Sequence, residues 1–245
     1  MTEVSAGRRP LSLEPLAVPA AYEHVLARLR RAIQLSEILP GERLPSERDL
    51  AESLAVSRIT VREALRVLQA EGVIATRRGK GGGTVVLPGA AAILQRPGGH
   101  DQRASRAREV REMRLALEPM AASLAASRAN QQDLQRLRDF QADLKASTDI
   151  ETFRRADSGF HLTIAAASGN NMLRVAIEDV RSAMFVMLDA HDFTIVHATS
   201  GEAHESILDA IAAGDAELAA RRMEAHVAAA SVEIAAALEE QERSG

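Results

Sequence analysis

Two predicted helices with a tight break between them occupy residues 46–71, and their order constrains the fold more than any other feature of the sequence. Ser46, with Asp49 three residues later, is typical of a helix N-terminus and predicts a short helix over Glu47–Leu54. After three further residues a longer helix begins, and Gly72 can end it. A short helix joined to a longer one by so tight a turn is a helix-turn-helix arrangement.

The longer helix has two contrasting faces. At 100° per residue, apolar residues lie on one face and arginines on the other. The apolar residues are Val61, Ala64, Leu65 and Leu68, and the arginines are Arg58, Arg62 and Arg66. A stripe of arginines is most often a solvated face, but the second helix of this arrangement begins in the major groove of DNA. The side chains at that start suit guanine edges and phosphates: Ser57, Arg58, Thr60 and Arg62.

The flanking segments extend this arrangement to a small domain. Apolar residues at helical spacing predict a first helix over residues 22–35. After Gly72 we expect two strands, residues 73–78 and 84–87, joined by the glycine-rich tip Gly79–Gly83. Glycines permit close approach to a duplex. Basic residues of the hairpin provide charge for phosphates or for the minor groove: Arg77, Arg78 and Lys80.

Charge is divided unevenly along the chain, although the net charge is only −4. Residues 21–86 contain 11 Lys or Arg against 8 Asp or Glu, whereas residues 106–245 contain 15 against 23. A stretch rich in Pro, Gly and Ala separates these two regions. We therefore expect four segments: a flexible arm over 1–20, a winged helix-turn-helix domain over 21–86, a linker over 87–105 and a helical domain over 106–241.

The second region is rich in Ala, Leu, Arg and Glu at helical spacing, so a mainly α fold is expected for the chain as a whole. We predict six or seven helices there, in a bundle large enough to enclose a small-molecule cavity. The approximate spans are 105–126, 130–147, 150–168, 171–190, 194–213 and 215–241.

The composition excludes several kinds of site. The chain has no cysteine, which excludes disulfides, iron–sulfur clusters and thiolate zinc sites, so a metal must be bound by His, Asp or Glu. One Tyr and five Phe are too few for a platform that stacks single-stranded bases. No apolar run approaches the roughly 20 residues of a membrane span, and no secretory signal is evident. We therefore expect a cytoplasmic protein without a membrane partner.

Four polar residues of the helical region form a candidate metal site. Asp157 and His161 are four residues apart and therefore lie on one helix face. His204 and His226 lie on two other predicted helices, and all four would form a shell that suits Zn²⁺, Ni²⁺, Mn²⁺ or another first-row divalent ion. Isolated helical histidines are more often plain surface or core residues. We assign no role to the remaining histidines, His24, His100, His191 and His197.

Residues 21–86 also resemble the winged helix-turn-helix of the GntR family of bacterial transcription regulators. The resemblance rests on Leu44–Ala51, Val56–Leu65, Leu68, Gly72 and the tip Gly79-Lys80-Gly81. It implies contacts with double-stranded DNA from Arg48, Ser57, Arg58, Thr60, Arg62, Gly79 and Lys80.

Residues 106–240 resemble the helical effector-binding domain of FadR-type GntR regulators, called the FCD domain. The resemblance rests on Glu112–Glu118, Phe153–His161, Ala167–Asn170, His204–Ile207 and Ala225-His226. In metal-binding members one Asp and three His hold the ion, which implies Asp157, His161, His204 and His226 here. An arginine on the first helix commonly meets an effector carboxylate, which implies Arg114. The alternative is that Arg114 pairs with Glu112 or Glu118 on its own helix.

These observations favour a homodimeric, metabolite-responsive transcription factor that is not an enzyme. We expect a repressor that binds a pseudo-palindromic operator and responds to a small organic acid bound near a divalent metal. An effector that raises operator affinity would make it an activator or a co-repressed regulator instead. Two rivals remain: a metal-dependent hydrolase with an accessory DNA-binding domain, and a DNA-binding protein without an effector, whose histidines are core residues.

Overall fold

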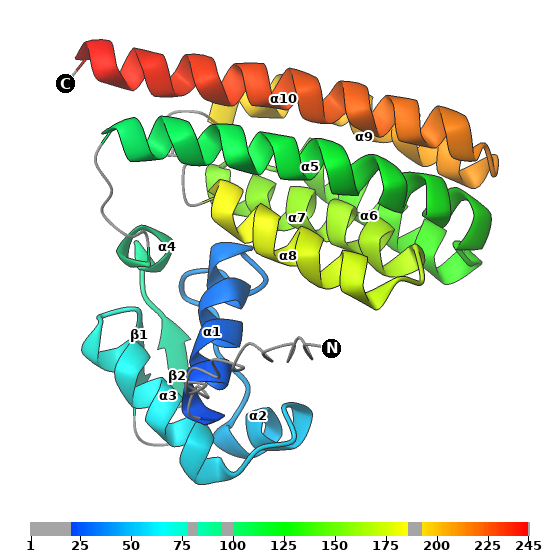
Figure 1. Cartoon of the computed structure of the whole chain (residues 1–245). Helices are drawn as coiled ribbons and strands as arrows, with labels where there is room; N and C mark the ends of the chain where they lie inside the picture. Colours follow the sequence, from blue (N-terminus) through cyan, green and yellow to red (C-terminus); the bar gives the residue numbers. More distant parts are fainter. Residues whose placement is uncertain (1–20, 78–82, 95–99, 186–192, 245) are drawn as a thin grey trace, which may run out of the picture.

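The computed structural model describes residues 21–77, 83–94, 100–185 and 193–244, which form two lobes (Figure 1). The expected flexible arm over 1–20, the tip of the wing and the middle of the expected linker lie outside the described residues. None of the helices in the described ranges has an apolar stretch of membrane-spanning length.

The first lobe is the predicted winged helix-turn-helix. Its elements are α1 (Ala21–Gln34), α2 (Glu47–Ser53), α3 (Arg58–Ala70), β1 (Ile74–Arg77), β2 (Gly83–Val86) and the short α4 (Ala90–Ile93). The two strands are antiparallel, with Ile74 opposite Val86. The side chain of Ser46 accepts a hydrogen bond from the Asp49 amide, and that of Ser57 from the Thr60 amide, so a serine caps each helix of the pair.

The apolar faces of these elements form one core. Val61, Ala64 and Leu68 of α3 are fully buried against the apolar face of α1 and against the hairpin. Ala90 is also fully buried in this core, so the beginning of the expected linker is part of the first lobe. Alanines favour a helix, and three of them fall in the four residues of α4.

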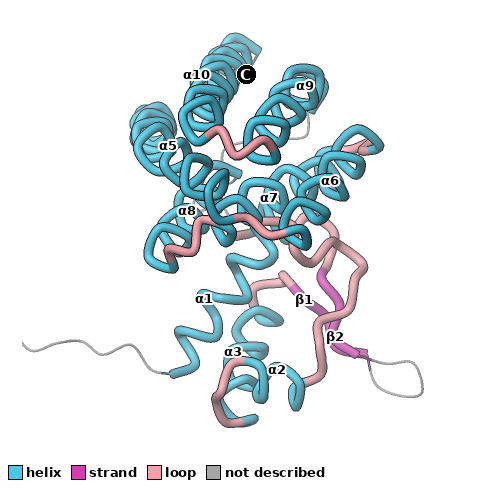
Figure 2. Tube along the Cα trace, turned by 90° about the vertical axis from the view of Figure 1, so that its right-hand side faces the viewer, coloured by secondary structure: helices cyan, strands magenta, loops and turns pink. Residues whose placement is uncertain are grey.

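The second lobe is a helical bundle. Six helices are present in its described residues: α5 (His100–Arg128), α6 (Gln131–Ala146), α7 (Ile150–Ala167), α8 (Asn171–Phe185), α9 (Phe193–Ala212) and α10 (Ala216–Ser244). Figure 2 shows them viewed nearly along their axes. Gly169 and Gly214 have positive φ and follow α7 and α9 closely, as expected where a glycine ends a helix. The predicted mainly α fold, with a winged helix-turn-helix followed by a bundle of six to seven helices, is confirmed.

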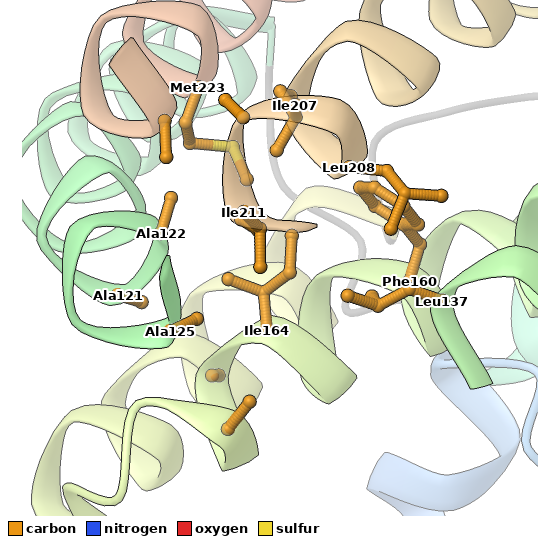
Figure 3. Packing of buried hydrophobic residues seen from close by; sticks show 14 of the residues in the cluster. Ala121, Ala122, Ala125, Leu137, Phe160, Ile164, Ile207, Leu208, Ile211 and Met223 are labelled. Atoms are coloured by element: carbon orange, nitrogen blue, oxygen red, sulfur yellow. The ribbon is translucent and has the colours of Figure 1, made fainter. Parts of the chain in front are cut away.

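Small residues on α5 allow the other helices to approach it closely. Ala121, Ala122 and Ala125 are buried there, and α10 packs along much of α5 (Figure 1). The larger side chains of this core come from the surrounding helices: Leu137, Phe160, Ile164, Ile207, Leu208, Ile211 and Met223 (Figure 3). The candidate metal residues lie on α7, α9 and α10, which this core holds in place.

The two lobes meet where the end of α1 lies against α8 (Figures 1 and 2). Arg31 pairs with Asp179, and its Nη1 lies 3.7 Å from Oε2 of Glu178. Ser182 Oγ donates a 2.7 Å hydrogen bond to Oε1 of Gln34. The next residue of the first lobe, Leu35, is fully buried in a small apolar cluster with Val110 of α5 and Met184 of α8. Polar and apolar contacts therefore both join α8 to the first lobe.

Candidate functional site

Five of the predicted DNA-contacting residues lie in α2 and α3 or at the cap of α3. Arg58, Ser57 and Arg48 are exposed, and Thr60 is half-buried. The Ser57 and Thr60 hydroxyls lie 2.8 Å apart, because Ser57 also caps α3. Thus the structure brings Arg48, Ser57, Arg58, Thr60 and Arg62 to one end of the first lobe, whereas Gly79 and Lys80 lie outside the described residues.

Two of these arginines take part in exposed ion pairs. Arg62 Nη2 lies 2.7 Å from Oε2 of Glu47, and Arg48 Nε lies 3.3 Å from Oδ1 of Asp49. The hydrogen bond from Arg62 lowers the pKa of Glu47 below its usual range. Exposed pairs of this kind contribute little to stability, so a phosphate can replace the carboxylate at small cost. The sequence did not indicate this pairing between α2 and α3.

The four predicted metal ligands are brought together inside the bundle. Asp157 and His161 lie one turn apart on α7, His204 comes from α9 and His226 from α10. Nε2 of His161 lies 3.2 Å from Nε2 of both His204 and His226, and the last two nitrogens are 3.3 Å apart. Oδ1 of Asp157 lies 3.5 Å from Nε2 of His204. All four residues are buried.

These separations fit a bound divalent ion. Nitrogen ligands about 2.0–2.1 Å from a metal lie roughly 3.3–3.4 Å apart in a tetrahedron and roughly 2.9 Å apart in adjacent octahedral positions. The three observed Nε2 separations of 3.2–3.3 Å fall in this range. Burial lowers the pKa of His204 and His226 well below the usual value, with neighbouring positive groups acting in the same direction. The neutral imidazoles thus offer lone pairs to a cation.

The histidine rings are also held in orientation by their neighbours. Phe160 stacks on His204, with ring centroids 4.2 Å apart and an interplanar angle of 7°. On the far side of His161, Nδ1 lies 2.6 Å from Oε2 of Glu118. A carboxylate at Nδ1 favours the tautomer that has its proton on Nδ1, which leaves the Nε2 lone pair facing the centre of the cluster.

Two buried arginines border the cluster. Arg114 donates from Nε to Oε1 of Glu118 at 2.8 Å, so the alternative of a pair on its own helix is realised in this structure. Arg181, which is fully buried on α8, donates to Oδ2 of Asp157 and lies 3.4 Å from Oε1 of Glu118. Asp157 therefore has one oxygen facing Arg181 and the other facing the histidines.

The charges of this network compensate one another. Burial alone would raise the pKa of Glu118, but Arg114, His161 and Arg181 together hold it well below its usual range. Burial likewise opposes ionisation of Asp157, yet Arg181 and its other charged neighbours lower the pKa of that carboxyl. Two carboxylates and two guanidinium groups are thus charged together in a buried site, beside three histidines whose pKa values burial lowers.

Glu118 and Arg181 were not predicted as members of this site. The sequence did indicate that Glu118 could pair with Arg114, because it lies four residues later on the same helix. Nothing in the sequence indicated that Arg181 belongs to the site, because its partners come from two other helices. Of the histidines without an assigned role, His24 is exposed and His197 has Nε2 3.1 Å from the Leu144 carbonyl oxygen. The side chain of His100 and the whole of His191 lie outside the described part of the chain.

A groove of about 390 Å³ lies between α9 and α10. Its lining combines small residues, among them Ala203 and Ala229, with Arg222 and Glu202. His226 contributes to the wall as well as to the metal cluster, so the cluster borders directly on the groove.

In comparisons with known proteins, each lobe matches a known family. Residues 21–86 match the family described as bacterial regulatory proteins, gntR family, and residues 109–229 match the FCD domain. The HTH-type transcriptional regulator LutR of Bacillus subtilis (strain 168) is 32% identical over 209 residues, which cover 80% of this chain and 92% of that protein. The Uxu operon transcriptional regulator of Escherichia coli (strain K12) is 32% identical over 226 residues, which cover 84% and 83% of the two chains.

A third relative and a solved structure extend the comparison. The HTH-type transcriptional repressor NanR of Cronobacter sakazakii (strain ATCC BAA-894) is 30% identical over 237 residues, which cover 91% of this chain and 86% of that protein. The structure of E. coli McbR/YncC aligns with a TM-score of 0.53 and 23% identity, over 92% of this chain and 100% of that chain, and supports the fold alone. The chain therefore belongs to the GntR family of bacterial regulatory proteins, as a DNA-binding transcription regulator of the FadR type with an FCD domain.

Proposed function

We propose that this regulator represses transcription from a specific operator and that a small organic acid, bound beside a divalent metal in the second lobe, modulates its DNA binding. The observation that carries this proposal is the buried cluster of one aspartate and three histidines beside Arg114. Zn²⁺, Ni²⁺ and Mn²⁺ are the candidate ions. The protein would act in the cytoplasm, as a homodimer, on a pseudo-palindromic site.

On the DNA side, we assign the contacts to the exposed end of α3 and to the wing. Arg58 and Arg62 would reach guanine edges or phosphates, and the Ser57 and Thr60 hydroxyls would contact phosphates. The remaining proposed contacts are Arg48, Gly79 and Lys80. Since each first lobe reads one half-site, a two-fold dimer would require a two-fold operator.

On the effector side, Asp157 and the three histidines would hold the ion. A bound divalent ion supplies a Lewis-acidic centre that attracts an anionic oxygen. Arg114 would bind a second oxygen of the same carboxylate group, because a guanidinium forms paired hydrogen bonds with a carboxylate. To do so it must loosen its hydrogen bond with Glu118. Because the metal ion and the Arg114 guanidinium are both positively charged, the site would favour organic acids over neutral metabolites.

Communication between the two sites would run through α8. Arg181 on this helix contacts the metal ligand Asp157, and the adjacent Ser182 donates a hydrogen bond to Gln34 of α1. Met184 lies 3.0 Å from Nη1 of Arg114 and packs in the apolar cluster with Leu35. A small rearrangement around Arg114 and Arg181 would thus reach the first lobe directly. Coupling of about 1–3 kcal/mol is typical of such linked sites.

Fluorescence anisotropy tests the proposal. The purified full chain is titrated against its own upstream intergenic DNA and against a scrambled duplex, at physiological salt. We expect a preference of about 10³ or more for the upstream DNA. Metal-loaded protein should then lose roughly 5–150-fold in operator affinity when the correct member of a panel of mono-, hydroxy- and dicarboxylates is added. Analytical ultracentrifugation of the same sample should give the mass of a dimer.

Two results would contradict the proposal. Equal affinity for the two duplexes would argue against specific binding at the upstream DNA. Retention of operator affinity with every carboxylate, with metal and without it, would favour the rival of a DNA-binding protein without an effector. The similarity to proteins named as transcription regulators supports a regulator over the rival metal-dependent hydrolase.

A further inference from the structure

We propose that Glu118 is a positioning residue shared by the metal site and the anion site, so that metal binding at His161 makes Arg114 available to an anion. This inference rests on the proposed metal site and adds a regulatory link within it. Its basis is the placement of a single buried carboxylate between one candidate metal ligand and the candidate anion-binding arginine.

The two oxygens of Glu118 face different partners. Oε2 lies 2.6 Å from Nδ1 of His161, and Oε1 accepts the hydrogen bond from Nε of Arg114 at 2.8 Å. Arg181 Nη1 lies 3.4 Å from the same Oε1. The side chain of Glu118 is only 2% exposed, so water does not compete for these partners. If the interaction of Glu118 with one of these partners changes, its interactions with the other partners must therefore change as well.

Metal binding would strengthen the contact with His161. Its Nε2 faces the cluster, so an ion there withdraws electron density from the imidazole and makes the Nδ1 proton a better donor. Glu118 would then interact more strongly with His161, and its hydrogen bond with Arg114 would become weaker. The ion also adds positive charge to a network in which two carboxylates balance two guanidinium groups, and this excess favours an incoming anion.

The other end of the Arg114 guanidinium is suited to receive that anion. Its Nη1 donates to Sδ of Met184 at 3.0 Å, and a thioether sulfur is a weak acceptor. An anionic oxygen can displace the sulfur with a gain in hydrogen-bond strength. Because the effect is mutual, an anion that occupies Arg114 would in turn release Glu118 to His161 and tighten metal binding.

The test measures Co²⁺ binding to the full-length protein through its visible d–d absorption, with and without succinate as a carboxylate that chelates Co²⁺ weakly. Glu118→Gln keeps the shape of the side chain and removes its charge. We expect the variant to bind Co²⁺ about 10–100-fold more weakly than the wild type, with an altered d–d spectrum. In the wild type, Co²⁺ should tighten succinate binding measured by calorimetry. In the variant this tightening should be smaller, because only the direct attraction between the ion and the anion remains.

Two further variants serve as controls. Glu112→Gln makes the same change at an exposed position of α5 and should leave Co²⁺ affinity unchanged. If the loss of the charge on Glu118 impairs folding, the double variant Arg114→Gln with Glu118→Gln removes both charges of the pair. The double variant should still bind Co²⁺ more weakly than Arg114→Gln alone, because only the latter retains the carboxylate beside His161.

The outcomes separate this inference from the proposed function. Wild-type Co²⁺ affinity in Glu118→Gln would overturn the positioning role while leaving the metal site intact. Succinate binding that is the same with and without Co²⁺ in the wild type would overturn the coupling. Absence of Co²⁺ binding by the wild type itself would overturn the proposed metal site, and this inference with it.

Discussion

The two lobes use pairs of arginine and carboxylate in opposite ways. In the first lobe the Arg62 side chain is 47% exposed and pairs with Glu47 at the surface, whereas in the bundle Arg181 is fully buried between Asp157 and Glu118. Solvent weakens the first kind of pair, so its arginine can exchange a carboxylate for a phosphate. Burial makes the second kind costly to break, so it fixes geometry. The same residue types thus give an exchangeable pair at Arg62 in one lobe and a pair that fixes geometry at Arg181 in the other.

The strongest test of this contrast removes the buried guanidinium. Arg181→Met removes the guanidinium that pairs with both Asp157 and Glu118 in a buried site, and we expect a loss of about 3–5 kcal/mol in unfolding free energy. The exposed pair of Arg221 with Glu217 provides a matched control. Arg221→Met should change stability by less than about 0.5 kcal/mol. Urea unfolding measures both, and similar losses in the two variants would remove the distinction.

Removal of the metal tests how much a bound ion stabilises the buried cluster. Protein freed of metal by a chelator should gain about 2.7 kcal/mol in stability when Zn²⁺ is present at 100 times its dissociation constant, because the ion binds only the folded cluster. The thermal midpoint should rise accordingly, by roughly 2–4 °C for each kcal/mol. His204→Ala should lose this gain and His24→Ala, on the exposed side of α1, should keep it. An equal gain in His204→Ala would place the ion elsewhere.

Loss of an exposed arginine should affect recognition without affecting stability. Arg58→Ala is expected to cost about 1–3 kcal/mol in binding to the operator and little in binding to scrambled DNA, because its contact would be with a base edge. Lys80→Ala should weaken binding to both duplexes and reduce the salt dependence of binding. Anisotropy titrations at several salt concentrations distinguish the two. Equal losses on both duplexes for Arg58→Ala would exclude a role in base readout.

The smallest expected effect is at the contact between the lobes. Ser182→Ala removes the hydrogen bond to Gln34 and should cost about 0.5–1.5 kcal/mol in stability. Its more informative effect is on coupling, since the response of operator binding to metal and effector should decrease. Ser147→Ala removes a hydrogen bond to the Leu144 carbonyl at the end of α6 and serves as the control. A full response in Ser182→Ala would show that this contact does not transmit the signal.

Features set by local sequence were predictable. The alternation of apolar residues and arginines along α3, the cap at Ser46, and the shared face of Asp157 and His161 follow from local sequence and helical spacing. The convergence of His204 and His226 on that face followed from a family resemblance, because spacing along the chain does not specify how three helices cross.

Features set by tertiary packing were not predictable. Arg181 lies 24 residues after Asp157 and on a different helix, so only the crossing of α7 and α8 brings the two together. The burial of Ala90 likewise depends on the core that it completes, although its local sequence indicated a linker. Contacts along one helix can be inferred from its sequence, whereas contacts across helices need the structure.

The adjacency of Arg181 and Ser182 on α8 has a consequence for how this regulator can diversify. A substitution on α8 that adapts the effector site to a new acid would also disturb the contact between α8 and the first lobe. By contrast, α9 and α10 lie on the opposite side of the bundle from α1 (Figure 1). Changes there, around the groove next to His226, can alter ligand preference while the DNA-binding lobe keeps its position. Selection for new ligands should therefore accumulate substitutions on α9 and α10 and leave α8 comparatively constant.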